Sequence, residues 1–226
     1  MLNNKSISVI IPAYNEEDYL DETLSNLNFQ WIDQVIVVND GSMDNTSRIA
    51  SKYKVDLFDL KKNQGKGNAI NYGLLRADGD IITIIDADLG KSVVEIRKLI
   101  EPLLNEDKLD ISIAVLPIKG GGLGIVRKTA DLALKCMTKN EMRAPLSGQR
   151  AFKKDILEKI YPLQEGFGLE MGFNLLIFKH NLKFVEVECG FKHRVTKSNF
   201  SGYMHRGLQL HDILKTLWEM KKNNYV

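Results

Sequence analysis

The segment Asp80–Gly90, DIITIIDADLG, decides the fold class of this chain. Its first part, Asp80–Ile85, reads as a continuous apolar strand, and two carboxylates follow it at Asp86 and Asp88. A strand that is apolar throughout is typical of a parallel sheet covered on both faces. The segment therefore predicts a buried strand that ends in an acidic loop.

Strand and helix patterns alternate on both sides of this segment, which predicts an α/β fold with a mostly parallel central sheet and helices on both faces. Asn15 is expected to cap the first helix, because acidic residues follow it where the helix dipole favours negative charge. The expected strands are Ser6–Ile11, Gln34–Val38, Val55–Leu60 and Asp110–Val115, and the expected helices are Asn15–Leu27, Asp44–Tyr53, Lys66–Leu75 and Val93–Leu104.

The second half of the chain is less regular, but it extends the same pattern. We expect one domain over residues 1–226, with a nucleotide-binding half at 1–116 and an acceptor-binding half at 117–226. The Gly120–Gly124 loop, GGGLG, is expected to be a mobile lid. Further helices are expected at Ile125–Met137, Lys154–Ile160, Leu169–His180 and Gly207–Lys222, a strand at Phe184–Cys189 and a loop at Asn199–Tyr203.

The composition argues against a nucleic-acid-binding, zinc-binding, secreted or membrane-spanning protein. A net charge of +2 over 226 residues gives no electrostatic case for nucleic acid as a partner. The chain has only two cysteines, Cys136 and Cys189, without zinc-ligand spacing, and two isolated thiols fit a reducing cytosol. The amino terminus lacks the apolar core of a signal peptide, and no stretch reaches membrane-span length. A cytoplasmic location is therefore expected.

Four polar clusters follow the predicted parallel strands directly. Ligands of open α/β sheets bind at the carboxyl ends of the strands, so these clusters predict a shared site. Polar loops are common, but the convergence of four of them on one edge favours a ligand site. The clusters are Pro12–Glu16, Asn39–Ser42, Lys61–Lys66 and Asp86–Asp88.

The Asp86-Ala87-Asp88 triplet predicts a metal site. Alternate side chains of extended backbone point the same way, so both carboxylates are expected to face one hard cation. Mg²⁺ or Mn²⁺ prefers oxygen ligands and is commonly shared with substrate phosphates. A cation at this place would neutralise a diphosphate leaving group. The alternative is an ordinary solvated turn.

Two further residues are candidates for nucleotide contacts. Asp40, in a turn-like Asn-Asp-Gly-Ser sequence, is expected to accept an N–H from a nucleobase, and Lys66 is expected to pair with phosphate. The Gly-Lys-Gly context of Lys66 lacks the Ser or Thr of a phosphate-binding P-loop, so kinase or ATPase chemistry is not supported.

Four blocks, SVIIPAYNEE, VVNDGSMDNT, NQGKGNAINYG and DGDIITIIDADLG, resemble the nucleotide half of family 2 glycosyltransferases, which have the A-type fold. They occur in the family's order and cover roughly the first half of the chain. The resemblance implies that Asp86 and Ala87 lie against the nucleotide and that Asp86 and Asp88 hold the metal. It also implies a base and ribose site formed by Pro12, Ala13, Tyr14, Glu16 and Asp40.

The second half resembles the family less closely. The segment Ala144–Phe152 is similar to the lining of the donor-sugar pocket and to a block of glucosyl-3-phosphoglycerate synthases, which retain anomeric configuration. The segment Gly166–Glu170 resembles the one that supplies the catalytic carboxylate of inverting enzymes, so Glu170 is the candidate base; the alternative is a charged helix face. Contacts to the donor sugar or diphosphate are implied for Ser147, Gly148, Gln149 and Arg150.

A late histidine often completes the metal shell in A-type transferases, and a nearby arginine meets the diphosphate. The resemblance therefore makes His193 and His205 the candidate metal ligands and Arg194 a candidate diphosphate contact. The alternative for either histidine is an ordinary surface or capping role.

Together these features predict an enzyme that transfers a single hexose from a nucleoside diphosphate sugar, with inversion and with Mg²⁺ or Mn²⁺. A retaining transferase like the phosphoglycerate enzymes, a nucleotidyltransferase and a non-catalytic nucleotide-binding module are the alternatives. The chain lacks the QxxRW motif of processive synthases, which favours transfer of one sugar.

The acceptor is left open between a small molecule and a lipid phosphate. The Gly207–Lys222 helix carries apolar residues at helical spacing, which indicates packing on the sheet or, alternatively, peripheral contact with the inner membrane surface. A homodimer is equally left open.

Overall fold

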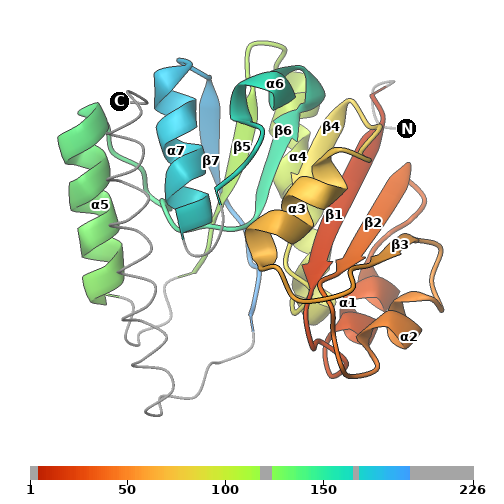
Figure 1. Cartoon of the computed structure of the whole chain (residues 1–226). Coiled ribbons are helices and arrows are strands. Elements are labelled where there is room, and N and C mark those ends of the chain that lie inside the picture. The colour runs from red at the N-terminus through yellow and green to blue at the C-terminus, as the bar shows by residue number, and fades with distance from the viewer. Residues whose placement is uncertain (1–4, 118–123, 165–167, 194–226) are drawn as a thin grey trace.

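A computed structural model describes residues 5–117, 124–164 and 168–193. Its centre is a seven-stranded sheet in the order β3-β2-β1-β4-β6-β5-β7, and helices cover both faces of it (Figure 1). This confirms the expected α/β fold, and the sheet is continuous from the first half of the chain into the second. The strands are β1 (Ile7–Ala13), β2 (Gln34–Asn39), β3 (Asp56–Asp59), β4 (Ile81–Ile84), β5 (Ile111–Val115), β6 (Arg150–Lys153) and β7 (Phe184–Glu188).

Strand β6 is the exception in an otherwise parallel sheet. It runs antiparallel to both of its neighbours, β4 and β5, and pairs Arg150 with Ile84. The sequence pattern does not predict this strand, because four residues that include an arginine and a lysine are too few to show a strand-like alternation. Since β6 is reversed, its amino end lies at the same edge as the carboxyl ends of β4 and β5.

The helices pack in two layers that follow from the alternation of side chains along the strands. Ile10 and Ile36 belong to a core cluster with α3, α6 and α7, whereas Val9 and Val37 belong to another with α1, α2 and α4. The helices are α1 (Leu20–Asn26), α2 (Thr46–Ala50), α3 (Lys66–Leu74), η1 (Gly90–Glu95), α4 (Ile96–Asn105), α5 (Gly124–Thr138), η2 (Lys154–Ile156), α6 (Leu157–Ile160) and α7 (Leu169–Lys179).

The prediction that Asn15 caps the first helix is wrong. Helix α1 begins at Leu20, and Asn15 adopts a left-handed conformation with φ of 54°. Its side-chain oxygen accepts the backbone N–H of Met43 at 3.0 Å, so Asn15 ties the loop after β1 to the loop after β2. The second helix is shorter than expected at both ends, and at its start Asp44 accepts the Thr46 N–H from outside the helix.

Several expectations concern residues outside the described ranges. They include the Gly120–Gly124 loop, apart from Gly124 itself, the Asn199–Tyr203 loop and the Gly207–Lys222 helix. In the part of the chain that is described, no helix combines the length and the apolar character needed to cross a bilayer.

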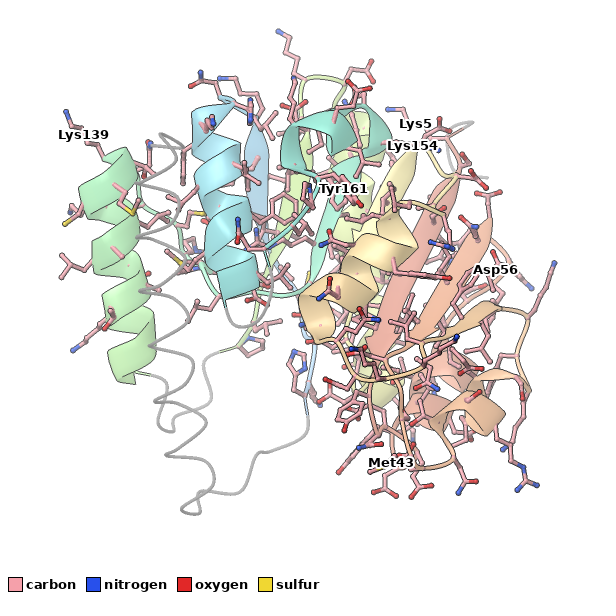
Figure 2. All side chains as sticks on the ribbon, viewed as in Figure 1. Lys5, Met43, Asp56, Lys139, Lys154 and Tyr161 are labelled. Carbon is pink, nitrogen blue, oxygen red and sulfur yellow. The ribbon has the colours of Figure 1, made fainter. Side chains whose placement is uncertain are left out.

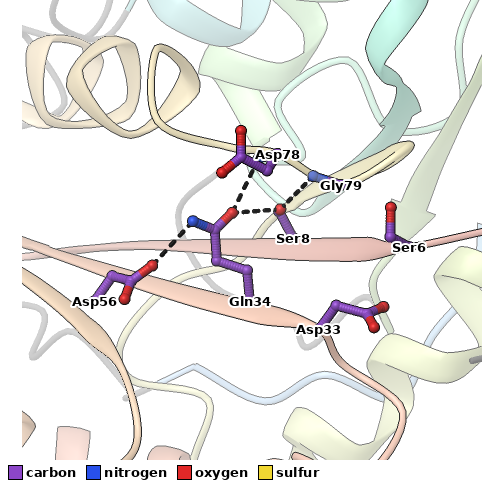
Figure 3. A pocket seen from close by; sticks show the side chains of 7 residues that line it. All are labelled: Ser6, Ser8, Asp33, Gln34, Asp56, Asp78 and Gly79. Carbon is purple, nitrogen blue, oxygen red and sulfur yellow. Dashed lines mark hydrogen bonds between the residues drawn. The ribbon is translucent and has the colours of Figure 1, made fainter.

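A polar depression of about 340 Å³ lies at the amino ends of β1 and β2. Its polar groups bond mainly to one another (Figure 3): Gln34 accepts from the Ser8 hydroxyl and the Asp78 N–H and donates to Asp56. The side chain of Gln34 is thus fully hydrogen-bonded within the protein. We interpret this network as a structural link between the strand ends rather than as a ligand site.

Candidate functional site

The candidate residues gather at the opposite edge, where β1, β2 and β4 end. Figure 2 places Met43 at this end of the molecule, and Lys5 and Lys154 at the other end. Helix α3 begins here with Lys66, and the segment before β6 arrives here because β6 is reversed. Side chains from both halves of the chain therefore meet at one edge, as expected for this class of sheet.

Asp86, Asp88 and His193 form the core of the site. One ligand atom from each of them lies within 4.8 Å of the other two. The Nδ1 atom of His193 is 3.0 Å from Asp88 Oδ1 and 3.7 Å from Asp86 Oδ2. Burial alone would lower the pKa of His193, but the hydrogen bond to Asp88 and the nearby carboxylates outweigh it and raise that pKa.

This donor set fits a small hard cation. Two carboxylates and one imidazole within a few ångströms are ligands that Mg²⁺ and Mn²⁺ accept, and several positions would be left for phosphate oxygens or water. The strand β4 is fully buried, and the loop that follows it carries both carboxylates. Ala87 and Asp88 lie in a turn rather than in the extended backbone expected from the sequence, yet both carboxylates still come together with His193.

Lys66 lies directly against this carboxylate group. Its Nζ atom is 2.6 Å from Asp86 Oδ1 and 3.8 Å from Glu170 Oε1. Burial alone would lower the pKa of Lys66, but the negative charges of Asp86 and Glu170 outweigh it and raise the pKa. The same ion pair, with the charge of His193, outweighs burial and lowers the pKa of Asp86. Lys66 is therefore a fixed positive charge at the centre of the site.

The segment before β6 contributes Gln149 and Gly148. The Gln149 side chain donates to Asp86 Oδ2 at 2.7 Å. A Cβ atom on Gly148 would lie 2.9 Å from Lys66 Nζ and 3.5 Å from Glu170 Oε1. Glycine is thus the residue that leaves room for the Lys66 ion pairs, and the segment forms one wall of the site.

Glu170 lies on the first turn of α7, and its side chain is 17% exposed. Its Oε1 atom lies 3.8 Å from the Lys66 Nζ atom, so Lys66 is shared between Glu170 and Asp86. This position brings Glu170 to the site that the sequence assigned to it, while its role as base stays a prediction.

Asp40 has an internal role that the sequence did not indicate. Its carboxylate oxygens accept the backbone N–H groups of Gln64 and Gly65 at 2.8 and 2.7 Å. Gly41, with φ of 70°, approaches the backbone of Lys62 so closely that a Cβ atom would lie 2.5 Å away. Asp40 therefore holds the loop that leads into Lys66, and its contact with a nucleobase stays a prediction.

The loop after β1 supplies the other candidates for base and ribose contacts. Pro12 and Ala13 are buried at the end of β1, whereas Tyr14 is 43% exposed beside them. The Glu16 N–H donates to Thr46 Oγ1 at 2.8 Å. Ala87 is buried, and its carbonyl accepts the Thr23 hydroxyl at 2.7 Å. These contacts fix the loop backbones.

Arg150 points into the protein rather than outward. It is 2% exposed, its Nε atom donates to the Ser147 carbonyl, and its guanidinium lies over the Phe173 ring. Burial lowers the pKa of Arg150 to about 10, although the charges of Glu170 and Glu186 oppose the shift. Arg150 joins the segment before β6 to helix α7, and its contact with a diphosphate stays a prediction.

Arg194 and His205 lie outside the described residues, so His193 is the candidate histidine that the structure brings to the carboxylates. Three further residues hold the backbone around the metal-site side chains and were not predicted from the sequence: Thr23, Ser92 and Glu95. They carry no motif, because each acts through hydrogen bonds to backbone groups that are distant in the sequence.

Known proteins resemble this chain in sequence and in fold. The model of glycosyl transferase family 2 matches residues 8–161. Dolichol-phosphate mannosyltransferase of Pyrococcus furiosus is 31% identical over 82% of this chain and 56% of its own length. Human dolichyl-phosphate beta-glucosyltransferase is 30% identical over 83% of this chain and 54% of its own length. The chain thus spans about half of these two relatives.

A solved structure has the same architecture. Glucosyl-3-phosphoglycerate synthase of Mycobacterium tuberculosis, in complex with Mn²⁺, uridine-diphosphate-glucose and phosphoglyceric acid, superposes with a TM-score of 0.77 at 26% identity. The match covers 96% of this chain and 79% of that one.

Proposed function

Because the chain belongs to glycosyl transferase family 2, and is accordingly a glycosyltransferase, we propose that it transfers one hexose from a nucleoside diphosphate sugar to a lipid phosphate. The observation that carries the donor part is the convergence of Asp86, Asp88 and His193 with Lys66 at one sheet edge. The lipid-phosphate part rests on the relatives, two of which are named for dolichol-phosphate acceptors.

Asp86, Asp88 and His193 would hold Mg²⁺ or Mn²⁺, as their oxygen and imidazole donors fit such a cation. The bound cation would neutralise the charge that develops on the diphosphate as it leaves. The similar structure of glucosyl-3-phosphoglycerate synthase is a complex with Mn²⁺ and uridine-diphosphate-glucose, which supports this choice of metal and donor class.

Lys66 and Gln149 orient the leaving group in this proposal. In the free protein both bond to Asp86, and a diphosphate offers each of them a stronger or equal acceptor. Lys66 supplies a positive charge, and Gln149 supplies a neutral N–H donor. Preorganised donors of this kind stabilise charge with little reorganisation at the moment of reaction.

Glu170 is the proposed catalytic base. The acceptor oxygen attacks C1 of the sugar, the bond from C1 to the diphosphate oxygen breaks, and Glu170 takes the proton that the acceptor oxygen still carries. Direct displacement of this kind inverts the configuration at C1. In the free protein the Glu170 carboxylate lies 3.8 Å from the Lys66 ammonium group, which places it beside the proposed leaving-group site.

The retaining alternative has its own support. The fold of glucosyl-3-phosphoglycerate synthase matches nearly the whole chain, and by analogy the acceptor would then be a small phosphorylated acid.

A lipid acceptor instead implies a reaction at a membrane surface. We propose the inner, cytoplasmic surface, where nucleotide sugars are available.

An acceptor panel tests the proposal. The purified chain is incubated with Mn²⁺ and radiolabelled UDP-glucose, UDP-N-acetylglucosamine or GDP-mannose, together with polyprenyl phosphate in detergent, 3-phosphoglycerate or no acceptor. We expect label in the organic phase with polyprenyl phosphate only. Label on 3-phosphoglycerate would replace this proposal with the retaining one. No turnover of any donor, with or without acceptor, would contradict the proposal.

A further inference from the structure

The segment Cys189–His193, here called the His193 strap, brings the histidine to the two aspartates. It leaves the sheet after β7, where the Cys189 N–H still donates to the Val115 carbonyl at 3.1 Å. Four residues later it ends at the 3.0 Å contact between His193 and Asp88. The position of the histidine therefore depends on what holds the strap between these two points.

The short helix η1 holds it at two places. Glu95 Oε2 accepts the Gly190 N–H at 2.7 Å, and Ser92 Oγ accepts the Lys192 N–H at 2.9 Å. The Ser92 hydroxyl donates in turn to the Leu89 carbonyl at 2.6 Å, which fixes the direction of its lone pairs. The two side chains thus accept N–H groups from alternate residues of the strap.

An apolar contact lies between the two anchors. Phe191, 3% exposed, points from the strap into the core cluster that contains Leu89 and Val93. The alternation is that of an extended strand, with Phe191 inward and the N–H groups of Gly190 and Lys192 on η1. Burial of the ring holds the strap against the helix, and the two hydrogen bonds fix its register.

We propose that Glu95 and Ser92 are positioning residues that set the place of His193 beside Asp86 and Asp88. The inference rests on the proposed function, since it concerns the metal site of that function. Helix η1 begins two residues after Asp88, so the anchors and the aspartates belong to one continuous segment. The third ligand is therefore held in place by the helix that directly follows the other two.

Such supporting contacts have a measurable effect on metal sites. Removing a hydrogen bond that orients a ligand typically lowers metal affinity by about 10- to 100-fold. The reason is that a loosened ligand must be ordered when the metal binds, and the ordering reduces the binding free energy.

Mn²⁺ affinity of the full chain, measured by the electron paramagnetic resonance signal of free Mn²⁺, tests the proposal. Glu95→Ala is expected to weaken Mn²⁺ binding by about tenfold. Glu95→Gln keeps an acceptor oxygen for the Gly190 N–H and is expected to retain most of the affinity. Lys98→Met removes only the ion pair between Lys98 and Glu95 and is expected to bind as the parent does. Glu101→Gln, on the exposed face of α4, is the matched control.

The dependence on His193 separates positioning from general stability. His193→Ala removes the third ligand, so its Mn²⁺ affinity measures the full contribution of that ligand. Adding Glu95→Ala to His193→Ala is expected to weaken Mn²⁺ binding no further. Ser92→Ala gives a second, milder test that leaves the Glu95 anchor in place, and we expect a weaker effect in the same direction.

Different failures point to different conclusions. An equal loss from Glu95→Ala with and without His193 would overturn the inference, as would unchanged affinity in both Glu95→Ala and Ser92→Ala. Unchanged affinity in His193→Ala would instead contradict the metal site of the proposed function. Circular dichroism of each variant confirms that the chain is folded before affinities are compared.

Discussion

The ammonium group of Lys66 lies 2.6 Å from Asp86 Oδ1. One of the two carboxylates that would hold the metal is therefore already neutralised by the chain's own cation. A second carboxylate, Glu170, shares the same ammonium group at 3.8 Å. Lys66 and a divalent cation compete for Asp86, whereas Lys66 and the cation cooperate once a diphosphate is bound.

Replacing Lys66 by Met should therefore change two affinities in opposite directions. Without a nucleotide, Mn²⁺ should bind more tightly, because a positive charge beside its ligands has been removed. UDP in the presence of Mn²⁺ should bind about tenfold more weakly, equivalent to about 1.4 kcal/mol. Calorimetric titration measures both, with Lys62→Met, an exposed lysine of the same loop, as control. Weaker Mn²⁺ binding by the nucleotide-free variant would contradict the competition.

Replacing Asp40 by Asn should affect stability as well as binding. The amide can accept only one of the two N–H groups that the carboxylate now accepts, and a hydrogen bond to a charged group contributes about 1.5–3 kcal/mol. Urea unfolding should show that the free energy of unfolding falls by an amount in that range. The Michaelis constant for the donor should rise by a larger factor than turnover falls.

The exposed Asp18→Asn variant is the control for Asp40. Parent-like stability in Asp40→Asn would mean that the two hydrogen bonds to the loop contribute little. A large loss of turnover with an unchanged Michaelis constant would remove Asp40 from the base site.

The two thiols should react at very different rates. Cys136 is exposed, whereas Cys189 is buried, and burial together with the charge of Glu95 raises the pKa of Cys189 to about 12. Because the thiolate is the reactive form, Ellman's reagent at pH 8 should label one thiol per folded chain rapidly, and two in guanidinium. Rapid labelling of both thiols in the folded chain would show that the start of the His193 strap is open.

Replacing Glu170 by Gln tests its role as base. Donor and Mn²⁺ affinity should persist while transfer falls by about 10²–10⁴, the usual contribution of a general base. Glu158→Gln, exposed on α6, is the control. A loss below about tenfold would mean that the acceptor oxygen arrives already ionised. Proton NMR of the parent's product should show the configuration opposite to the donor's, and a retained configuration would exclude direct displacement.

Much of the fold follows from the sequence because its strands are buried and parallel. The strand pattern Asp80–Ile85 predicts both a central strand and the edge at which Asp86 and Asp88 emerge. Lys66 and Glu170 were found through their motifs, and the structure brings both to that edge. Local patterns thus predicted the residues that have chemistry of their own.

The contacts that position those residues were not predictable in the same way. Asp40 bonds to residues 24 and 25 positions away, and Glu95 bonds to a residue 95 positions away. Such pairs leave no periodicity, since either partner alone is an ordinary polar residue. The reversed strand β6 was missed for a related reason: its pairing with β4 and β5, rather than its four-residue pattern, makes it a strand.

The most direct test of the account is the Mn²⁺ dependence of sugar transfer in the parent and in Asp88→Ala. Chelator should stop transfer by the parent, and added Mn²⁺ should restore it with saturation. Asp88→Ala should remain folded and lose at least about 100-fold in transfer at the same Mn²⁺ concentration, because a direct ligand matters at least as much as its supporting contacts. Asp78→Ala, exposed at the opposite edge, should behave as the parent. Full transfer by Asp88→Ala, with the parent still inhibited by chelator, would contradict the assignment of the metal to this site.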